Sequence, residues 1–387
     1  MTYPEMIIEA HPNLYKIDSN LNKLVQKIEL LNYINPINIE LEKRNFFASK
    51  YNENPSFKYR KIDFNAHALQ QELFSQDVDS IEDEASRDFY RDLIYDYSGL
   101  IQCIETIGSG KKFYFNSLKS FGTPTQRDVE NAQFILHFED ESYDEEMFPV
   151  FNADEAADYF NEFVKRYDFE FRIKFSNRLS AAAMVQNNTR TLLLKKNHRF
   201  SANQLKVLAN HEIGVHLVTT YNGLDQSLKV FRNGFPNNVE TQEGLAVFSE
   251  YMSGCLTLYR LKELSYRVLA ADSLRKGFNF CDTFDLLHNQ HKLNREESYN
   301  ITLRAHRGGG FTKDYMYLTG LKKVYDYYKS DGNLDTLLSG KVCLERRDII
   351  EQWQKEGLAC APKYKNHAFF KNENEHEALN FILENLK

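Results

Sequence analysis

The sequence has no long apolar run and no excess of positive charge, and both absences narrow the possible protein classes. No stretch approaches 18 consecutive apolar residues, so no membrane-spanning helix is predicted. Acidic residues outnumber basic ones, 55 against 48, and the formal net charge is −7. Such a chain lacks the basic surplus with which proteins bind nucleic acids or acidic membranes. We therefore expect a soluble protein with neither partner.

The cysteines follow no pattern that indicates a disulfide framework or a cysteine zinc site. There are five of them, widely separated and without a C-x-x-C pair: Cys103, Cys255, Cys281, Cys343 and Cys360. The first 18 residues also lack the basic segment and apolar run of a signal peptide. A reducing, cytoplasmic location is the resulting prediction.

The composition supports a large folded core. Hydrophobic residues make up 42% of the 387 positions and aromatic residues 14%. This length suits one large domain or two closely packed ones, and no repeat with a period of 20 to 50 residues is present. We expect a mainly helical N-terminal region over residues 1–150, packed on a second domain, residues 151–387, that carries the chemistry.

Three short apolar segments interrupt the helical patterns. They are "FEFRIKF" (169–175), "AAAMVQ" (181–186) and "TLLLKK" (191–196), and "SNRLS" and "NNTR" separate them as turns. The links are too short for direct crossovers, so the strands are predicted to be antiparallel. The predicted fold class is α+β: mostly helical, with a small antiparallel sheet.

A helix is predicted directly after the third strand. Ser201 is a suitable N-cap, Gln204 follows three residues later as in a capping box, and the helical pattern ends near Gly223. The helix therefore contains "NHEIGVH", residues 210–216.

The two histidines of this segment have an unusual spacing. His211 and His216 are five residues apart, which in a regular α-helix separates their directions by about 140°. A π-turn returns residues five apart to nearly one face, and such turns tend to occur at functional sites. Gly214 lies between the histidines and relieves steric restriction where the turn widens. A bulged H-E-x-x-x-H metal site is therefore possible.

A hydrolytic zinc site needs a third protein ligand. The next predicted helix offers three glutamates on roughly one face, and their spacing alone does not choose among them: Glu240, Glu243 and Glu250. Gly244 would let another segment approach closely beside Glu243. Two histidines further along the chain are weaker alternatives, His288 and His291.

The pair "NHEIGVH" and "TQEGLAVFSEY" resembles a known family. It is the family of the microtubule-associated tyrosine carboxypeptidase and its microbial relatives, named for its QEGLA motif. The segments "INPINIELEKRNFF", "RAHRGGGFTKDYMYLTGL" and "GLACAPKYK" extend the resemblance over nearly the whole chain.

This resemblance implies a zinc metallopeptidase with a gluzincin-like core, in which the sheet packs beside the metal-binding helix. It implies that His211, His216 and Glu243 hold one zinc ion and that Glu212 is the catalytic glutamate. Glu212 would take the proton of the zinc-activated water and later pass it to the leaving amine.

A carboxypeptidase also needs a cation for the terminal carboxylate of its substrate. Arg304, Arg307 and Lys313 surround the glycine triplet 308–310 and are the candidates. Tyr315 and Tyr317 could donate a hydrogen bond to the oxyanion. The expected substrate is the C-terminus of a peptide or protein, with a large apolar or aromatic residue removed. Tubulin is not expected, because the chain is acidic and lacks a long basic N-terminal extension.

Two other functions remain open. The first is a zinc endopeptidase or aminopeptidase, which would not need the cationic pocket. The second is a non-catalytic binding protein in which the histidine pair is structural. Glu212 beside the two histidines argues against the second, because a binding module needs no general base.

Overall fold

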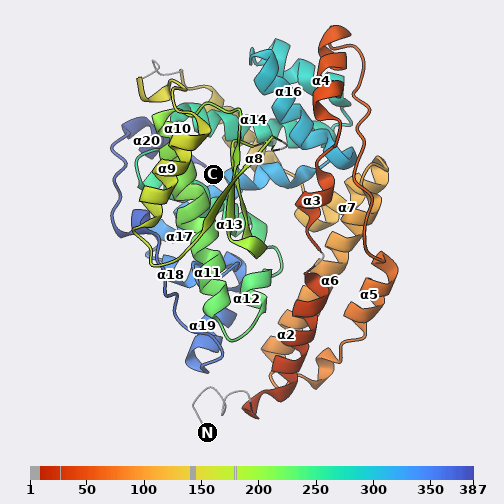
Figure 1. Ribbon diagram of the computed structural model, residues 1–387, viewed down its shortest axis with the longest axis vertical. Coiled ribbons are helices and arrows are strands. Elements are labelled where there is room, and N and C mark those ends of the chain that lie inside the picture. The colour runs from red at the N-terminus through yellow and green to blue at the C-terminus, as the bar shows by residue number, and fades with distance from the viewer. Residues whose placement is uncertain (1–8, 27, 140–144, 178, 180) are drawn as a thin grey trace. The chain divides into compact units, whose positions relative to one another are not determined.

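A computed structural model (Figure 1) describes residues 9–26, 28–139, 145–177, 179 and 181–387. These residues are mostly helical and include one small sheet, which confirms the predicted α+β class. Within them, no helix combines the length and apolar composition needed to cross a bilayer.

The chain forms two compact units, each built from separate segments. Unit 1 comprises the described residues of Met1–Ser19, Glu139–Arg260 and Thr319–Leu386. Unit 2 comprises the described residues of Asn20–Phe138 and Leu261–Leu318, together with Lys387. Compactness alone does not show which segments fold independently, so the division expected at residue 150 stays a prediction.

Unit 1 contains the sheet and the helices that pack on it. Its strands are β1 (Arg172–Ser176), β2 (Ala183–Gln186) and β3 (Thr191–Lys195). Its helices are α9 (Ala153–Val164), α10 (Ala202–Leu208), the π-helix η4 (Ala209–Leu217), α11 (Val218–Asp225), α12 (Val230–Asn233), α13 (Asn238–Met252), α18 (Leu334–Leu337), α19 (Arg347–Lys355) and α20 (Glu377–Asn385).

Unit 2 is helical. It contains α3 (Leu30–Ile34), α4 (Ile39–Ala48), α5 (Ala66–Phe74), α6 (Glu84–Thr106), α7 (Lys111–Phe121), α8 (Gln126–Leu136), α15 (Phe280–Asp285), the π-helix η5 (Leu286–Gln290) and α16 (Arg295–His306). Three further helices have residues in both units: α2 (Pro12–Val25), α14 (Leu258–Arg275) and α17 (Met316–Lys329).

The sheet is mixed, and the prediction of a wholly antiparallel sheet was wrong. The strand order is β1-β3-β2, with β2 antiparallel and β1 parallel to β3. A short link cannot join two parallel strands directly, but here β2 makes the return path between them. β3 therefore lies between β1 and β2, which are the edge strands.

A hydrophobic core joins this sheet to the helix that carries the histidines. Leu192 and Leu194 of β3 are fully buried and belong to the same cluster as Phe160 of α9 and Ile213 and Leu217 of η4. Figure 1 shows the strands beside α9 and the helix run α10, η4 and α11. Burial of these large side chains is worth roughly 1.5–3 kcal/mol each. The core thus holds the histidine-bearing helix against the sheet.

The start of this helix run agrees in part with the predicted capping. The hydroxyl of Ser201 accepts a hydrogen bond from the backbone N–H of Gln204 at 3.0 Å, so the predicted N-cap is confirmed. The side chain of Gln204 contacts His198 instead, at 3.0 Å, so the second half of the capping box does not form. The run ends at Asp225, close to the predicted Gly223.

Candidate metal centre

The helix is widened where the histidine spacing predicts it. Residues 209–217 form a π-helix, and Gly214 lies inside it. The rings of His211 and His216 consequently lie on one side of the helix, with their centroids 5.0 Å apart. Gly214 also packs closely against Asn366. A Cβ added at Gly214 would lie 3.1 Å from the side-chain nitrogen of Asn366. The extra residue in the motif therefore brings the two histidines together.

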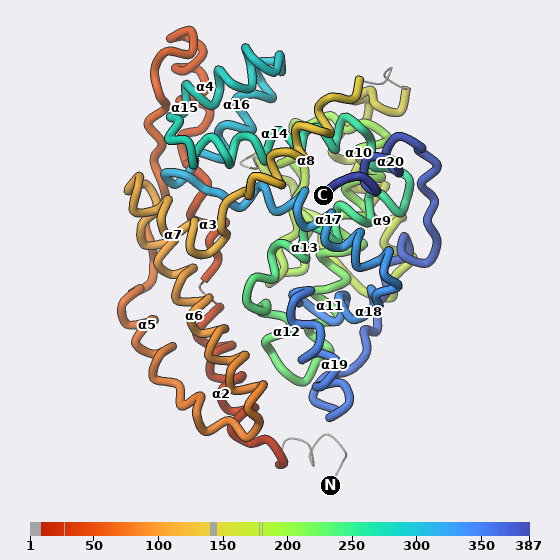
Figure 2. Tube along the Cα trace, turned by 180° about the vertical axis from the view of Figure 1, so that it is seen from behind, coloured from red at the N-terminus to blue at the C-terminus, as the bar shows by residue number. Residues whose placement is uncertain are grey.

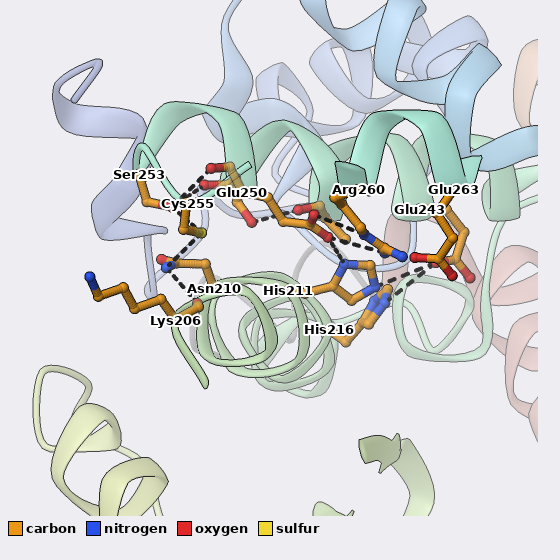
Figure 3. A network of polar contacts seen from close by, with 12 residues as sticks. Lys206, Asn210, His211, His216, Glu243, Glu250, Ser253, Cys255, Arg260 and Glu263 are labelled. Atoms are coloured by element: carbon orange, nitrogen blue, oxygen red, sulfur yellow. Dashed lines mark hydrogen bonds and ion pairs between the residues drawn. The ribbon is translucent and has the colours of Figure 1, made fainter. Parts of the chain in front are cut away.

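Glu243 of α13 completes a three-residue cluster (Figure 3). Its Oε2 atom lies 3.7 Å from Nε2 of His211 and 3.7 Å from Nε2 of His216. The potential ligand atoms all lie within 4.8 Å of one another. The three side chains are 8%, 20% and 12% exposed, respectively for His211, His216 and Glu243. Within the described part of the chain, this is the group of His, Cys, Asp or Glu side chains arranged to hold a metal ion.

The geometry of this cluster suits a zinc-sized ion. A separation of 3.7 Å is too long for a hydrogen bond. Ligands about 2.0–2.1 Å from a tetrahedral ion lie roughly 3.4 Å apart, close to the observed separation. Two imidazole nitrogens and one carboxylate oxygen are also a ligand set that zinc accepts. The residues present therefore fit the ion that the sequence resemblance implies.

The electrostatic environment favours a positive charge in the cluster. Burial opposes a charged imidazolium at His211, but the nearby carboxylates of Glu243 and Glu250 outweigh it and raise the pKa of His211 to about 9. The same negatively charged carboxylates would attract a metal cation.

The two other glutamates of α13 have different partners. Glu240 accepts from the hydroxyl of Thr319 and pairs with Lys323, each at 2.5 Å. Glu250 accepts a hydrogen bond from Nδ1 of His211 at 2.8 Å. Of the three candidates, only Glu243 therefore lies between the two Nε2 atoms.

The two histidines considered as alternatives lie in unit 2 and make ordinary contacts. Nδ1 of His288 is 2.8 Å from the carbonyl oxygen of Leu293. His291 packs against the ring of Tyr266, with centroids 5.5 Å apart. Neither joins the cluster of His211, His216 and Glu243.

A backbone hydrogen bond holds Glu212. Its Oε2 accepts from the N–H of Val185 in β2 at 2.9 Å, and the residue is buried. Strand β2 therefore touches the helix that carries the histidines.

Close backbone contact fixes α13, which carries Glu243. A Cβ added to Gly244 would lie 2.4 Å from the backbone of Gly320 in α17. The views of Figure 1 and Figure 2 both show α13 beside α17. The predicted close approach at Gly244 is thus confirmed.

The five residues predicted to bind substrate lie in unit 2 and have defined contacts. Arg304 donates from two nitrogens to Asp314, and Arg307 donates to Asn35 at 2.6 Å. Burial lowers the pKa of Arg307 to about 10.

The other three substrate candidates contact aromatic rings or the backbone. The ammonium of Lys313 lies 5.1 Å from the ring centroid of Tyr317. The hydroxyl of Tyr315 donates to the carbonyl of Phe121 at 2.8 Å. A role of these residues in substrate binding stays a prediction.

Comparison with known protein families agrees with the motif pair. A family model described as "Microtubule-associated tyrosine carboxypeptidase" matches residues 44–387, which include both motifs. No curated protein sequence matches the chain significantly.

Proposed function

Because the chain belongs to the microtubule-associated tyrosine carboxypeptidase family, we propose that it is a zinc-dependent carboxypeptidase acting on a peptide or protein C-terminus. The observation that carries this proposal is the position of Glu243 Oε2, 3.7 Å from Nε2 of both His211 and His216. In the proposal these three side chains hold one zinc ion. When bound, zinc supplies Lewis acidity that polarises a carbonyl and lowers the pKa of water.

Glu212 is the proposed general base. It follows the ligand His211 directly in the helix, and the amide of Val185 fixes one of its carboxylate oxygens. Glu212 would accept a proton from the attacking water and then donate it to the leaving amine. A carboxylate held in this way needs little reorganisation during the reaction.

Strand β2 is the proposed place for an extended substrate backbone. β3 is paired on both sides, so only the edge strands can accept another strand. Alternate residues of an antiparallel strand bond to the partner strand. Val185 directs its N–H to Glu212 instead, so this edge of β2 faces the histidine-bearing helix. Peptides commonly bind by adding a strand to such an edge.

The terminal carboxylate of the substrate is proposed to bind among Arg304, Arg307 and Lys313. All three cations remain candidates for direct contact: Arg304 directs two nitrogens to Asp314, and Arg307 donates to Asn35. Tyr315 and Tyr317 both remain proposed oxyanion donors, and the hydroxyl of Tyr315 donates to the carbonyl oxygen of Phe121.

Tyrosine is the first terminal residue to test, because the family description names it. That description also names microtubules, but the net charge of −7 does not favour an acidic partner such as the tubulin tail. We therefore keep a substrate other than tubulin, and a cytoplasmic location, as parts of the proposal.

Paired peptides test the reaction type. One peptide ends in tyrosine with a free carboxylate, and its partner carries a C-terminal amide. Release of tyrosine from the free peptide alone, dependent on added zinc, is the expected result. Equal cleavage of both peptides would indicate an endopeptidase, and loss of the N-terminal residue an aminopeptidase. Absence of both cleavage and zinc binding would leave a non-catalytic protein.

A further inference from the structure

The imidazole of His211, in η4, lies between two glutamates of α13, Glu243 and Glu250 (Figure 3). Its Nε2 faces Glu243 at 3.7 Å, and its Nδ1 is 2.8 Å from Oε1 of Glu250. The two glutamates are seven positions apart, and seven steps along an α-helix turn it by about 700°, within about 20° of two full turns. Both carboxylates therefore leave α13 on the same face, about 10 Å apart along the axis.

Glu250 is a buried charge that is paired on two sides. Its side chain is fully buried. Nε of Arg260 lies 3.2 Å from Oε2, and Nη2 lies 3.4 Å from Oε1. Buried ion pairs contribute little net stability, so stability alone explains the arrangement poorly.

The contact with Glu250 determines which nitrogen of His211 can bind a metal. A carboxylate accepts hydrogen bonds, so the proton of a neutral imidazole lies on Nδ1. The lone pair of Nε2 then points to the cluster with Glu243 and His216. The same hydrogen bond restricts rotation of the ring.

We propose that Glu250, itself held by Arg260, is a positioning residue that fixes the tautomer and the ring orientation of His211 for a bound metal ion. This inference rests on the proposed function, because it needs the metal site. It assigns to Glu250 a role outside the group of metal ligands. Outer carboxylates of this kind typically change metal affinity about 10- to 100-fold.

Zinc affinity tests the inference directly. Glu250→Gln keeps the shape of the side chain and removes its charge, while Glu250→Ala removes the acceptor. Competition with a chromophoric chelator should show zinc binding about 10-fold weaker for the first variant and up to about 100-fold weaker for the second. Glu240→Gln is the matched control, because Glu240 lies on the same helix and contacts Thr319 and Lys323 instead. Its zinc affinity should match that of the unmodified chain.

Cobalt substitution separates positioning from a purely structural role. The visible bands of bound Co²⁺ report ligand geometry, so they should shift in Glu250→Gln and stay unchanged in Glu240→Gln. Unfolding curves without metal identify any variant that has not folded, and Glu250→Gln carries the test if Glu250→Ala fails to fold. Folded Glu250 variants with unaltered zinc affinity and unaltered cobalt bands would overturn the inference and leave the proposed function intact. Failure of the unmodified chain to bind zinc would instead reject both.

Discussion

Glu212 and Glu243 are both buried beside the histidines, yet their contacts suit different chemistry. Glu243 presents an oxygen between two imidazole nitrogens, whereas Glu212 is hydrogen-bonded to the amide of Val185. A metal ligand must reach the metal position between the two Nε2 atoms. A general base must lie beside that position, with an oxygen that can accept the proton of the attacking water. These contacts support the assignment of Glu243 as ligand and Glu212 as base.

The variant Glu212→Gln tests this assignment. An amide keeps the size of the side chain but cannot take a proton from water, so peptide hydrolysis should fall by at least about 10²-fold. Zinc content, measured by metal analysis, should remain at one ion per chain. Glu162→Gln, on the exposed side of α9, should leave both quantities unchanged. Hydrolysis by Glu212→Gln at the unmodified rate would show that another group is the base.

Substitution of a proposed zinc ligand should remove the bound metal as well as the activity. In His216→Ala the cluster loses one of its three donor atoms, and zinc should no longer be retained during dialysis. Hydrolysis should be lost together with the metal, in contrast to Glu212→Gln, which loses hydrolysis alone. Retention of one zinc ion by His216→Ala would reject this ligand set.

The sequence predicts some of these residues and misses others for a physical reason. His211, Glu212 and His216 are local in the chain, and the five-residue spacing itself predicts the widened helix. The choice of Glu243 over Glu240 and Glu250 rests on family resemblance alone, because all three positions lie on roughly one face of the helix. The contact of Val185 with Glu212 depends on sheet packing, and no local pattern encodes it.

At the scale of elements, the π-helix and the sheet show what determines each structure. Local spacing and a glycine favour the widened helix, so it was predictable. The order of strands depends on which segments meet after the chain has turned back, and the lengths of the links do not determine it. The parallel pairing of β1 with β3 was therefore missed, although the strand positions were predicted closely.

Gly244 tests how far the site depends on the packing of α13 against α17. In Gly244→Ala the new methyl group would meet the backbone of Gly320 at 2.4 Å, so the helices must separate. We expect a loss of about 1–3 kcal/mol in unfolding free energy, measured with urea. Zinc binding should weaken as well, because Glu243 precedes the altered residue.

Gly99→Ala is the control for helix propensity. Gly99 lies within α6, and an added Cβ would meet only the side-chain oxygen of Ser120, at 3.1 Å. That hydroxyl can rotate away, so the roughly 1 kcal/mol that alanine gains over glycine in a helix should be retained. Equal stabilities of Gly244→Ala and the unmodified chain would show that α13 and α17 can separate without cost.

At the scale of the whole molecule, each compact unit is assembled from segments that are distant in the chain. The proposed zinc ligands all belong to unit 1, whereas Arg304, Arg307 and Lys313 belong to unit 2. Hydrophobic periodicity identifies a helix and its buried face, but it carries no information about which distant helix will cover that face. The helical content was therefore predictable from the sequence, and the grouping of segments was not.

The pH dependence of stability should report on His306 in unit 2. Its Nε2 lies 2.7 Å from the hydroxyl of Thr283, which contacts the hydroxyl of Ser273 at 2.7 Å, and the ring packs against Phe280. Burial lowers the pKa of His306 from 6.5 to about 4. Between these two values the unfolded chain binds more protons than the folded chain, so stability rises with pH.

The contribution of His306 to the free energy of unfolding is therefore complete above about pH 6.5. It is lost as the pH falls toward 4, by up to about 3 kcal/mol. Urea unfolding at a series of pH values should show the decline, and His306→Gln should flatten it, because glutamine keeps a hydrogen bond to Thr283 without titrating. His67→Gln, on the exposed side of α5, should leave the decline unaltered. Since Asp314 has a lowered pKa through its pairing with Arg304, despite its burial, its contribution is lost only at more acidic pH and does not mask the effect. An unchanged decline in His306→Gln would assign the pH sensitivity to another group.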